Sequence, residues 1–104
     1  MTKAKVIWTE QAIADLEVVY DFLAEKSPAG AQQVVESILK RTAQLETFPD
    51  SGIVVQRLST SDKLYRMLVE GNYKIIYRFN NETMAVFVEI IFDARMDPEK
   101  LGLK

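Results

Sequence analysis

Three β-rich runs follow one another in the second half of the chain, and only short turn-forming stretches separate them. The runs are Leu64–Val69, Tyr73–Asn80 and Ala85–Phe92. Gly71-Asn72 lies between the first two, and a polar Asn80–Thr83 stretch begins the second connection. Connections this short join antiparallel neighbours, because parallel pairing needs a crossover of a dozen or more residues. The pattern therefore predicts a β-meander, to which the rest of the chain must be added.

The first half begins with a short strand and an amphipathic helix. Lys5–Trp8 is rich in strand-forming residues, and Thr9 after it is a suitable helix N-cap. Apolar residues then recur at spacings of three and four, which predicts one buried helix face. These residues are Ile13, Leu16, Tyr20 and Leu23, flanked by Ala12 and Val19. We expect this helix to end near Lys26.

A second helix is predicted directly after the first. Proline suits the first position of a helix, so Ser27 is expected to cap a helix that starts at Pro28 and runs to about Thr47. So short a connection makes the two helices an antiparallel hairpin. Phe48 to Gly52, "FPDSG", reads as a loop, and the terminal "DPEKLGLK" is expected to form one helical turn.

The order of the predicted elements is β-α-α-β-β-β in a single domain, residues 1–104. Strands grouped after helices favour an α+β fold, with the helical hairpin on one face of a four-stranded antiparallel sheet. The chain is 104 residues long and 48% apolar, which is sufficient for a core without disulfides or metals.

Composition excludes several kinds of chemistry. The chain has no cysteine and no histidine, so thiolate nucleophiles, the usual general base and the commonest metal ligand are missing. We expect no metal and no cofactor. The net charge of −2 argues against binding nucleic acid by bulk charge. No apolar run is long enough for a bilayer or a signal peptide, so we expect no membrane contact and a cytoplasmic location.

The central hairpin, "YRMLVEGNYKIIYRF", carries three long cations: Arg66, Lys74 and Arg78. A three-residue loop that pairs Val69 with Tyr73 would place all three on one face of the sheet. A two-residue turn would put Arg66 and Arg78 on opposite faces, because a one-residue slip reverses the side chains of a strand. That slip would bury one arginine under the helices, at a cost of several kcal/mol if unpaired. The three-residue loop is therefore predicted.

The cations are then expected to stand together on the face away from the helices. Asp93 and Arg95, spaced by two at the end of the last strand, are expected to join them. This predicts a shallow anion-binding or partner-binding surface, since arginine suits phosphates and carboxylates. The other interpretation is that these charges only solvate an exposed sheet face. The candidate residues are Arg66, Lys74, Arg78, Asp93 and Arg95.

Several short motifs along the whole chain resemble those of one known protein family. The first helix has that family's "A-x-x-D-L" run at Ala12 to Leu16, and the second ends in "L-x-x-F-P-x-x-G" at Leu45 to Gly52. The hairpin resembles the family's "R-x-L-x-x-G-x-Y-R-I-x-Y-R" strand pair. The tail "IIFDARMDPEKL" resembles its usual ending, "H-x-R-x-D-P" after an aliphatic strand. Together these motifs resemble the RelE/ParE superfamily of bacterial toxins from plasmid-stabilisation toxin–antitoxin modules.

The resemblance implies one of two activities. RelE-like members cut mRNA on the ribosome with a cluster of basic residues, whereas ParE-like members lack that set and poison DNA gyrase. Arg66 and Arg95 match nuclease positions, and Lys74 replaces an arginine, but Leu68 stands where a second cation is expected. Asp93 replaces the family's histidine, and no tyrosine or histidine follows Phe92. Together with the "SP" junction and "FP-x-x-G" exit of the helices, this favours a ParE-like, non-enzymatic gyrase inhibitor.

Two alternatives stay open. One is a ribosome-dependent mRNA endoribonuclease with a reduced site of Arg66, Lys74 and Arg95. The other is a family member that has lost toxicity and only binds its antitoxin. In each case the resemblance implies a cognate antitoxin as partner, in a homodimer or a toxin–antitoxin hetero-oligomer.

Overall fold

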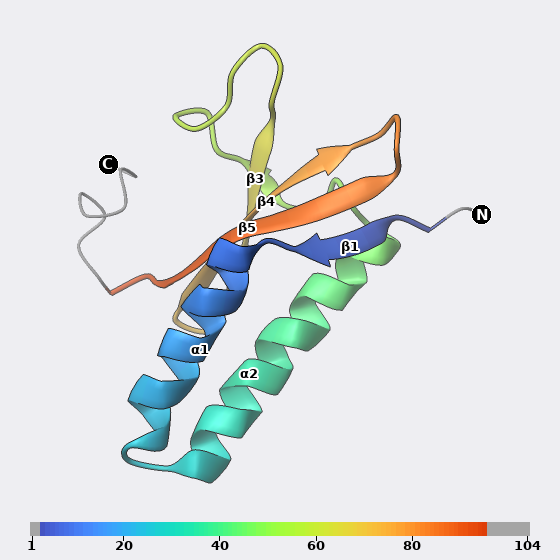
Figure 1. Ribbon diagram of the computed structural model, residues 1–104. Coiled ribbons are helices and arrows are strands. Elements are labelled where there is room, and N and C mark those ends of the chain that lie inside the picture. Colours follow the sequence, from blue (N-terminus) through green and yellow to red (C-terminus); the bar gives the residue numbers. More distant parts are fainter. Residues whose placement is uncertain (1–2, 96–104) are drawn as a thin grey trace.

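The computed structural model describes residues 3–95 as two helices packed on one face of a five-stranded sheet (Figure 1). The elements are β1 (Lys5–Trp8), α1 (Glu10–Ala24), α2 (Pro28–Ala43), a 3₁₀ turn (Gln44–Glu46), β2 (Ile53–Val54), β3 (Tyr65–Glu70), β4 (Tyr73–Asn80) and β5 (Ala85–Asp93). The α+β class and the helical hairpin on one face are confirmed. The predicted helical turn in 97–104 lies outside the described residues.

The sheet differs from the prediction in two ways. Its strand order is β1-β5-β4-β3-β2, and β1 runs parallel to β5, so the sheet is mixed rather than wholly antiparallel. The fifth strand, β2, has only two residues and pairs with β3 at the far edge. The parallel pair is possible because the helical hairpin and strands β2 to β4 lie between β1 and β5 in the sequence, which is ample for a crossover.

The helix ends follow the predicted caps. The Thr9 side chain accepts a hydrogen bond from the Ala12 amide, and Ser27 does the same for Gly30. The predicted apolar face of α1 is partly wrong, because Ile13 and Tyr20 are 46% and 39% exposed. The core side of α1 consists of Ala12, Leu16, Val19 and Leu23, which pack against the sheet. This rotation leaves apolar side chains of α1 in solvent.

The core lies between the helices and one face of β4 and β5. Ile38 and Leu45 are fully buried on the helical side, against Ile75, Tyr77 and Val88 of the sheet. Because strand side chains alternate, the helix-covered face of β4 also includes Tyr73. Lys74, Ile76 and Arg78 then point to the opposite face, where Leu58 from the β2–β3 segment lies near Ile76.

Candidate functional site

The hairpin turn decides where the candidate cations lie, and the predicted turn is wrong. Glu70 pairs with Tyr73, so the loop has two residues, Gly71 and Asn72. Gly71 has a φ of 59°, a conformation that suits glycine at the first position of a two-residue hairpin turn. The register shifts by one relative to the prediction, and Arg66 therefore pairs with Tyr77, on the helix-covered face.

Arg66 is not an unpaired buried charge, which is why the register is tolerated. Its guanidinium donates to the backbone carbonyls of Asp50 at 3.1 Å and Gly52 at 2.9 Å, and its side chain stays 21% exposed. The prediction overestimated the cost because it assumed that the helices cover this end of β3. Instead the 48–54 segment lies there, and its carbonyls accept the hydrogen bonds.

The Tyr77 hydroxyl binds the same segment from inside. It accepts a hydrogen bond from the Gly52 amide and donates one to the Pro49 carbonyl, each 2.8 Å long. A Cβ on Gly52 would stand 2.7 Å from the tyrosine ring. Only glycine therefore allows the backbone to lie this close to the ring. Burial raises the pKa of Tyr77 above its ordinary value, which keeps the hydroxyl protonated as a donor. Arg66 and Tyr77 thus hold the loop and belong to the framework.

Arg78 lies on the opposite face and is already paired. Its Nε donates to Glu89 at 2.6 Å, and its guanidinium stacks over the Phe87 ring at 4.2 Å. Glu89 is the extra residue of a β-bulge, because Ile76 pairs with Ile90 while Tyr77 pairs with Val88. Lys74 shares this face, between Val69 and Phe92. The predicted cluster is therefore divided between two faces of the sheet.

Asp93 and Arg95 form a third, separate group at the end of β5. Arg95 donates to both carboxylate oxygens of Asp93, with a shortest distance of 2.6 Å. These hydrogen bonds hold the pKa of Asp93 below its ordinary value. Asp93 pairs with Tyr73, so it lies on the helix-covered face rather than on the predicted open one. Burial, followed by the nearby Asp93 charge, raises the pKa of Tyr73.

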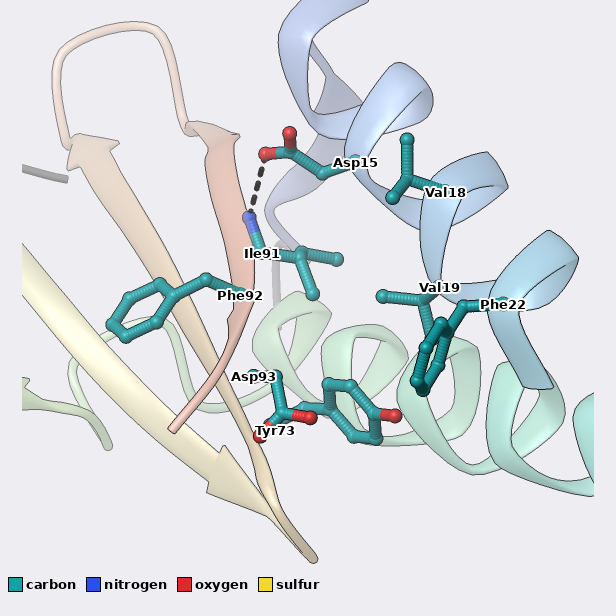
Figure 2. Close-up of a pocket in the computed structure, with 8 residues that line it drawn as sticks. All are labelled: Asp15, Val18, Val19, Phe22, Tyr73, Ile91, Phe92 and Asp93. Carbon is teal, nitrogen blue, oxygen red and sulfur yellow. Dashed lines mark hydrogen bonds between the residues drawn. The ribbon is translucent and has the colours of Figure 1, made fainter. Parts of the chain in front are cut away.

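Sequence reasoning missed a groove between α1 and β5, which Figure 2 shows. It measures about 400 Å³ and is mainly apolar, with Val18, Val19 and Phe22 from α1 facing Ile91 and Tyr73 of the sheet. Asp15 and Asp93 are its two carboxylates. The signal was present in the sequence, since Val18 and Phe22 are apolar residues four apart that lie off the predicted helix stripe.

No group of three or more potential ligands that could hold a metal ion exists within residues 3–95. The two α-helices in that range are also too short and too polar to cross a membrane.

Comparison with known proteins assigns the family. Residues 6–98 match the family model described as ParE toxin of type II toxin–antitoxin system, parDE. The chain belongs to the ParE toxin family. A curated relative, Toxin RelE2 of Caulobacter vibrioides, is 32% identical over 74 residues, covering 71% of this chain and 78% of that protein. This member of the ParE family is therefore also similar to a protein named RelE2, as the resemblance to the combined RelE/ParE superfamily predicts.

Solved structures confirm the fold of this ParE-family toxin. A chain of the chromosomal ParDE system from P. aeruginosa has a TM-score of 0.70 at 19% identity, covering 88% of this chain and 96% of that one. A chain of the archaeal RelE–RelB complex from Pyrococcus horikoshii has a TM-score of 0.64 at 17% identity, covering 93% and 100%. The shared fold thus occurs in proteins of both names.

Proposed function

We propose that this toxin inhibits DNA gyrase by binding it and does not cut RNA. The observation that argues against RNA cleavage is that the candidate cations do not lie together. Arg66 is bound to loop carbonyls, Arg78 to Glu89 and Arg95 to Asp93, on two faces and at one end of the sheet. Stabilising a phosphorane requires cations that converge on one phosphate, with groups that transfer protons beside them.

The tyrosines give further support. Without histidine, a nuclease would need another base to activate a 2′-hydroxyl, and tyrosine is one of the few side chains left. The pKa values of Tyr73 and Tyr77 are raised, so the phenolate form is even rarer at neutral pH than in water. Both tyrosines are also buried, at 6% and 0% exposure. Neither is suited to be a general base.

We infer the target-binding surface from cations that are either outside any salt bridge among residues 3–95 or largely exposed. Lys74 is in no salt bridge among residues 3–95 and borders Val69, which is 48% exposed, on the open face. Arg95 has a side chain 60% exposed. We propose Lys74 and Arg95 as target contacts, with Asp93 orienting Arg95. Arg66 and Arg78 stabilise the fold and are not proposed as target contacts.

The test is a supercoiling assay with purified toxin, gyrase, ATP and relaxed plasmid. We expect inhibition by the wild type and weaker inhibition by Lys74→Glu. Lys40→Glu, which makes the same charge change at an exposed position of α2, is the matched control and should inhibit like the wild type. Undiminished supercoiling at toxin concentrations well above that of gyrase would refute the proposal.

The ribonuclease alternative is favoured by one observation, the relative named Toxin RelE2. It would use Arg66, Lys74 and Arg95 on ribosome-bound mRNA. Incubation with ribosomes and a defined mRNA should give no cleavage under the gyrase proposal. Cleavage that Arg95→Ala abolishes would select the nuclease. Inactivity in both assays, with no growth defect on expression, would select a member that only binds its antitoxin.

We also propose a cognate antitoxin as partner, because structural relatives were solved as a ParDE system and as RelBE complexes. The assembly would be a toxin–antitoxin hetero-oligomer, with a toxin homodimer as the other possibility. The cytoplasmic location remains a prediction. Co-expression with the antitoxin and size measurement of the purified complex would give the assembly.

A further inference from the structure

The sheet ends differently on its two sides. Beyond the end of β1, the Ile91 amide of β5 donates to the Asp15 carboxylate at 3.0 Å, and α1 runs beside this stretch (Figure 2). On the other side the last strand is β2, Ile53–Val54, which pairs with β3 and has no further strand beside it within residues 3–95. The outer backbone groups of β2 therefore need a partner from elsewhere or remain in solvent.

The register of β2 against β3 gives the direction of these backbone groups. Val54 pairs with Arg66, and the next amide, that of Val55, donates to the Tyr65 carbonyl at 2.8 Å. Hydrogen-bonded and non-hydrogen-bonded residues alternate along an antiparallel pair, so the N–H and C=O of Val54 point away from β3. In the described part of the chain no turn or loop backbone group bonds to either of them. Val54 thus presents one free donor and one free acceptor at the edge.

This edge lacks the side chains that usually prevent strand addition. Residues 52–55 are Gly-Ile-Val-Val, with no proline and no charged side chain. Natural edge strands are commonly protected by lysine or proline, or by being very short, and β2 has only the last of these features. Ile53 is also 70% exposed, next to the free groups of Val54. An added strand would pair with these groups and cover this side chain.

A second copy of this chain fits the edge in a single register. The free donor and the free acceptor belong to the same residue, so two antiparallel copies related by a two-fold axis at Val54 would satisfy both. Each Val54 amide would donate to the Val54 carbonyl of the other copy. Ile53 of one copy would then lie opposite Val55 of the other, and apolar cross-strand pairs of this kind stabilise a sheet.

The charges near the edge agree with this register. Arg57 of one copy would lie opposite Ser51 of the other, one residue from Asp50, and symmetry repeats this arrangement at the other end of the contact. Unlike charges therefore approach each other, whereas like charges stay apart. The contact cannot extend as a ladder through Gly52, because its N–H and C=O are already bonded within the chain.

We propose that β2 is a self-association site, at which two copies of this chain pair edge to edge through Val54 and join their sheets. The contact has only two backbone hydrogen bonds between the copies, so the dimer is weak. We expect mostly monomer at about 10 µM and mostly dimer at about 1 mM. The inference goes beyond gyrase inhibition and does not depend on it.

Sedimentation equilibrium of the full chain across these concentrations measures the association. Val54→Pro removes the outward N–H but no bond to β3, so it should abolish the dimer, and circular dichroism checks that the variant is folded. Ile53→Lys should raise the dissociation constant about tenfold or more, because it places a charge in the contact. Ile13→Lys makes the same change at an exposed position of α1 and should dimerise like the wild type.

Cross-linking tests the register. The chain has no cysteine, so Val54→Cys introduces a single thiol. In the proposed dimer the two Cα atoms at this position would be about 5.5 Å apart, which is within reach of a disulfide. Ser51→Cys is the control, because its two copies would be about 20 Å apart along the paired strands. Under mild oxidation we expect a covalent dimer of the first variant and not of the second.

Three results would overturn the inference. The first is a wild-type chain that stays monomeric at about 1 mM, which would leave the edge to a strand of another protein. The second is a dimer that both Val54→Pro and Ile53→Lys leave unchanged. The third is Ser51→Cys cross-linking as readily as Val54→Cys. Sedimentation contains no gyrase, so failure here and failure of the gyrase proposal are distinguishable.

Discussion

We expect Tyr77→Phe to lower the free energy of unfolding by about 2 kcal/mol, because one buried and one partly buried hydrogen bond end at its hydroxyl. The Gly52 amide and the Pro49 carbonyl would each lose a partner at 2.8 Å, in a place where the side chain is 0% exposed. An unsatisfied buried polar group costs roughly 1–3 kcal/mol, and the phenyl ring itself would still pack. For a domain of this length the midpoint of thermal unfolding should fall by about 10 °C.

Urea titration followed by circular dichroism measures the change, with calorimetry as a second method. Tyr20→Phe is the matched control, since this tyrosine is 39% exposed and should lose less than about 0.5 kcal/mol. If Tyr77→Phe were as stable as the control, the hydroxyl would not hold the 48–54 segment, and the explanation of the Arg66 position would lose its basis.

The same tyrosine makes a pH prediction. Its pKa is raised in the folded state, so the unfolded chain releases the phenol proton more readily. Stability should be unaffected by this group below about pH 10 and should fall as the pH rises from there through the folded pKa. Tyr73 contributes in the same direction. The fall should be shallower in Tyr77→Phe, and an identical pH profile would contradict the assignment.

Other perturbations test separate parts of the structure. Gly52→Ala should destabilise by about 1–3 kcal/mol in urea titration, because the new Cβ would lie 2.7 Å from the Tyr77 ring. Asp93 has a lowered pKa, so its contribution should be present above about pH 4 and be lost as the pH falls through the folded value. Asp93→Asn should flatten that acid limb, and retention of the limb would show that the Arg95 pair is not its source. Ser27→Ala should cost about 1 kcal/mol through loss of the α2 cap, with helix loss seen by circular dichroism.

The sequence was sufficient for the parts of the fold that depend on local patterns. β4 has the predicted bounds, and α2 begins at Pro28 with Ser27 as its cap, because turn residues and cap chemistry act over a few positions. The two residues of β2 carry too little pattern to be recognised as a strand. The parallel pairing of β1 with β5 depends on contacts about 80 residues apart, which periodicity does not report.

The positions of the candidate site residues were harder to predict from the sequence. The prediction treated a helix-side Arg66 as an unpaired charge, because carbonyls of a distant loop have no signature in the sequence. One wrong turn length then placed Arg66 on the wrong face. Asp93 was assigned to the wrong face for a different reason. The extra residue of the β-bulge, Glu89, turns Asp93 to the same face as Tyr73, and no sequence pattern indicates such a bulge.

The hydrogen bond from the Ile91 amide to Asp15 has a consequence for how this chain behaves when concentrated. Past the end of β1, the edge of the sheet would otherwise present the Ile91 amide without a hydrogen-bond partner. The backbone of a neighbouring molecule could then pair with the edge as an added strand. A carboxylate from α1 occupies the position that such a neighbour's carbonyl would take. This hydrogen bond therefore disfavours strand addition by a neighbouring molecule at this part of the β5 edge.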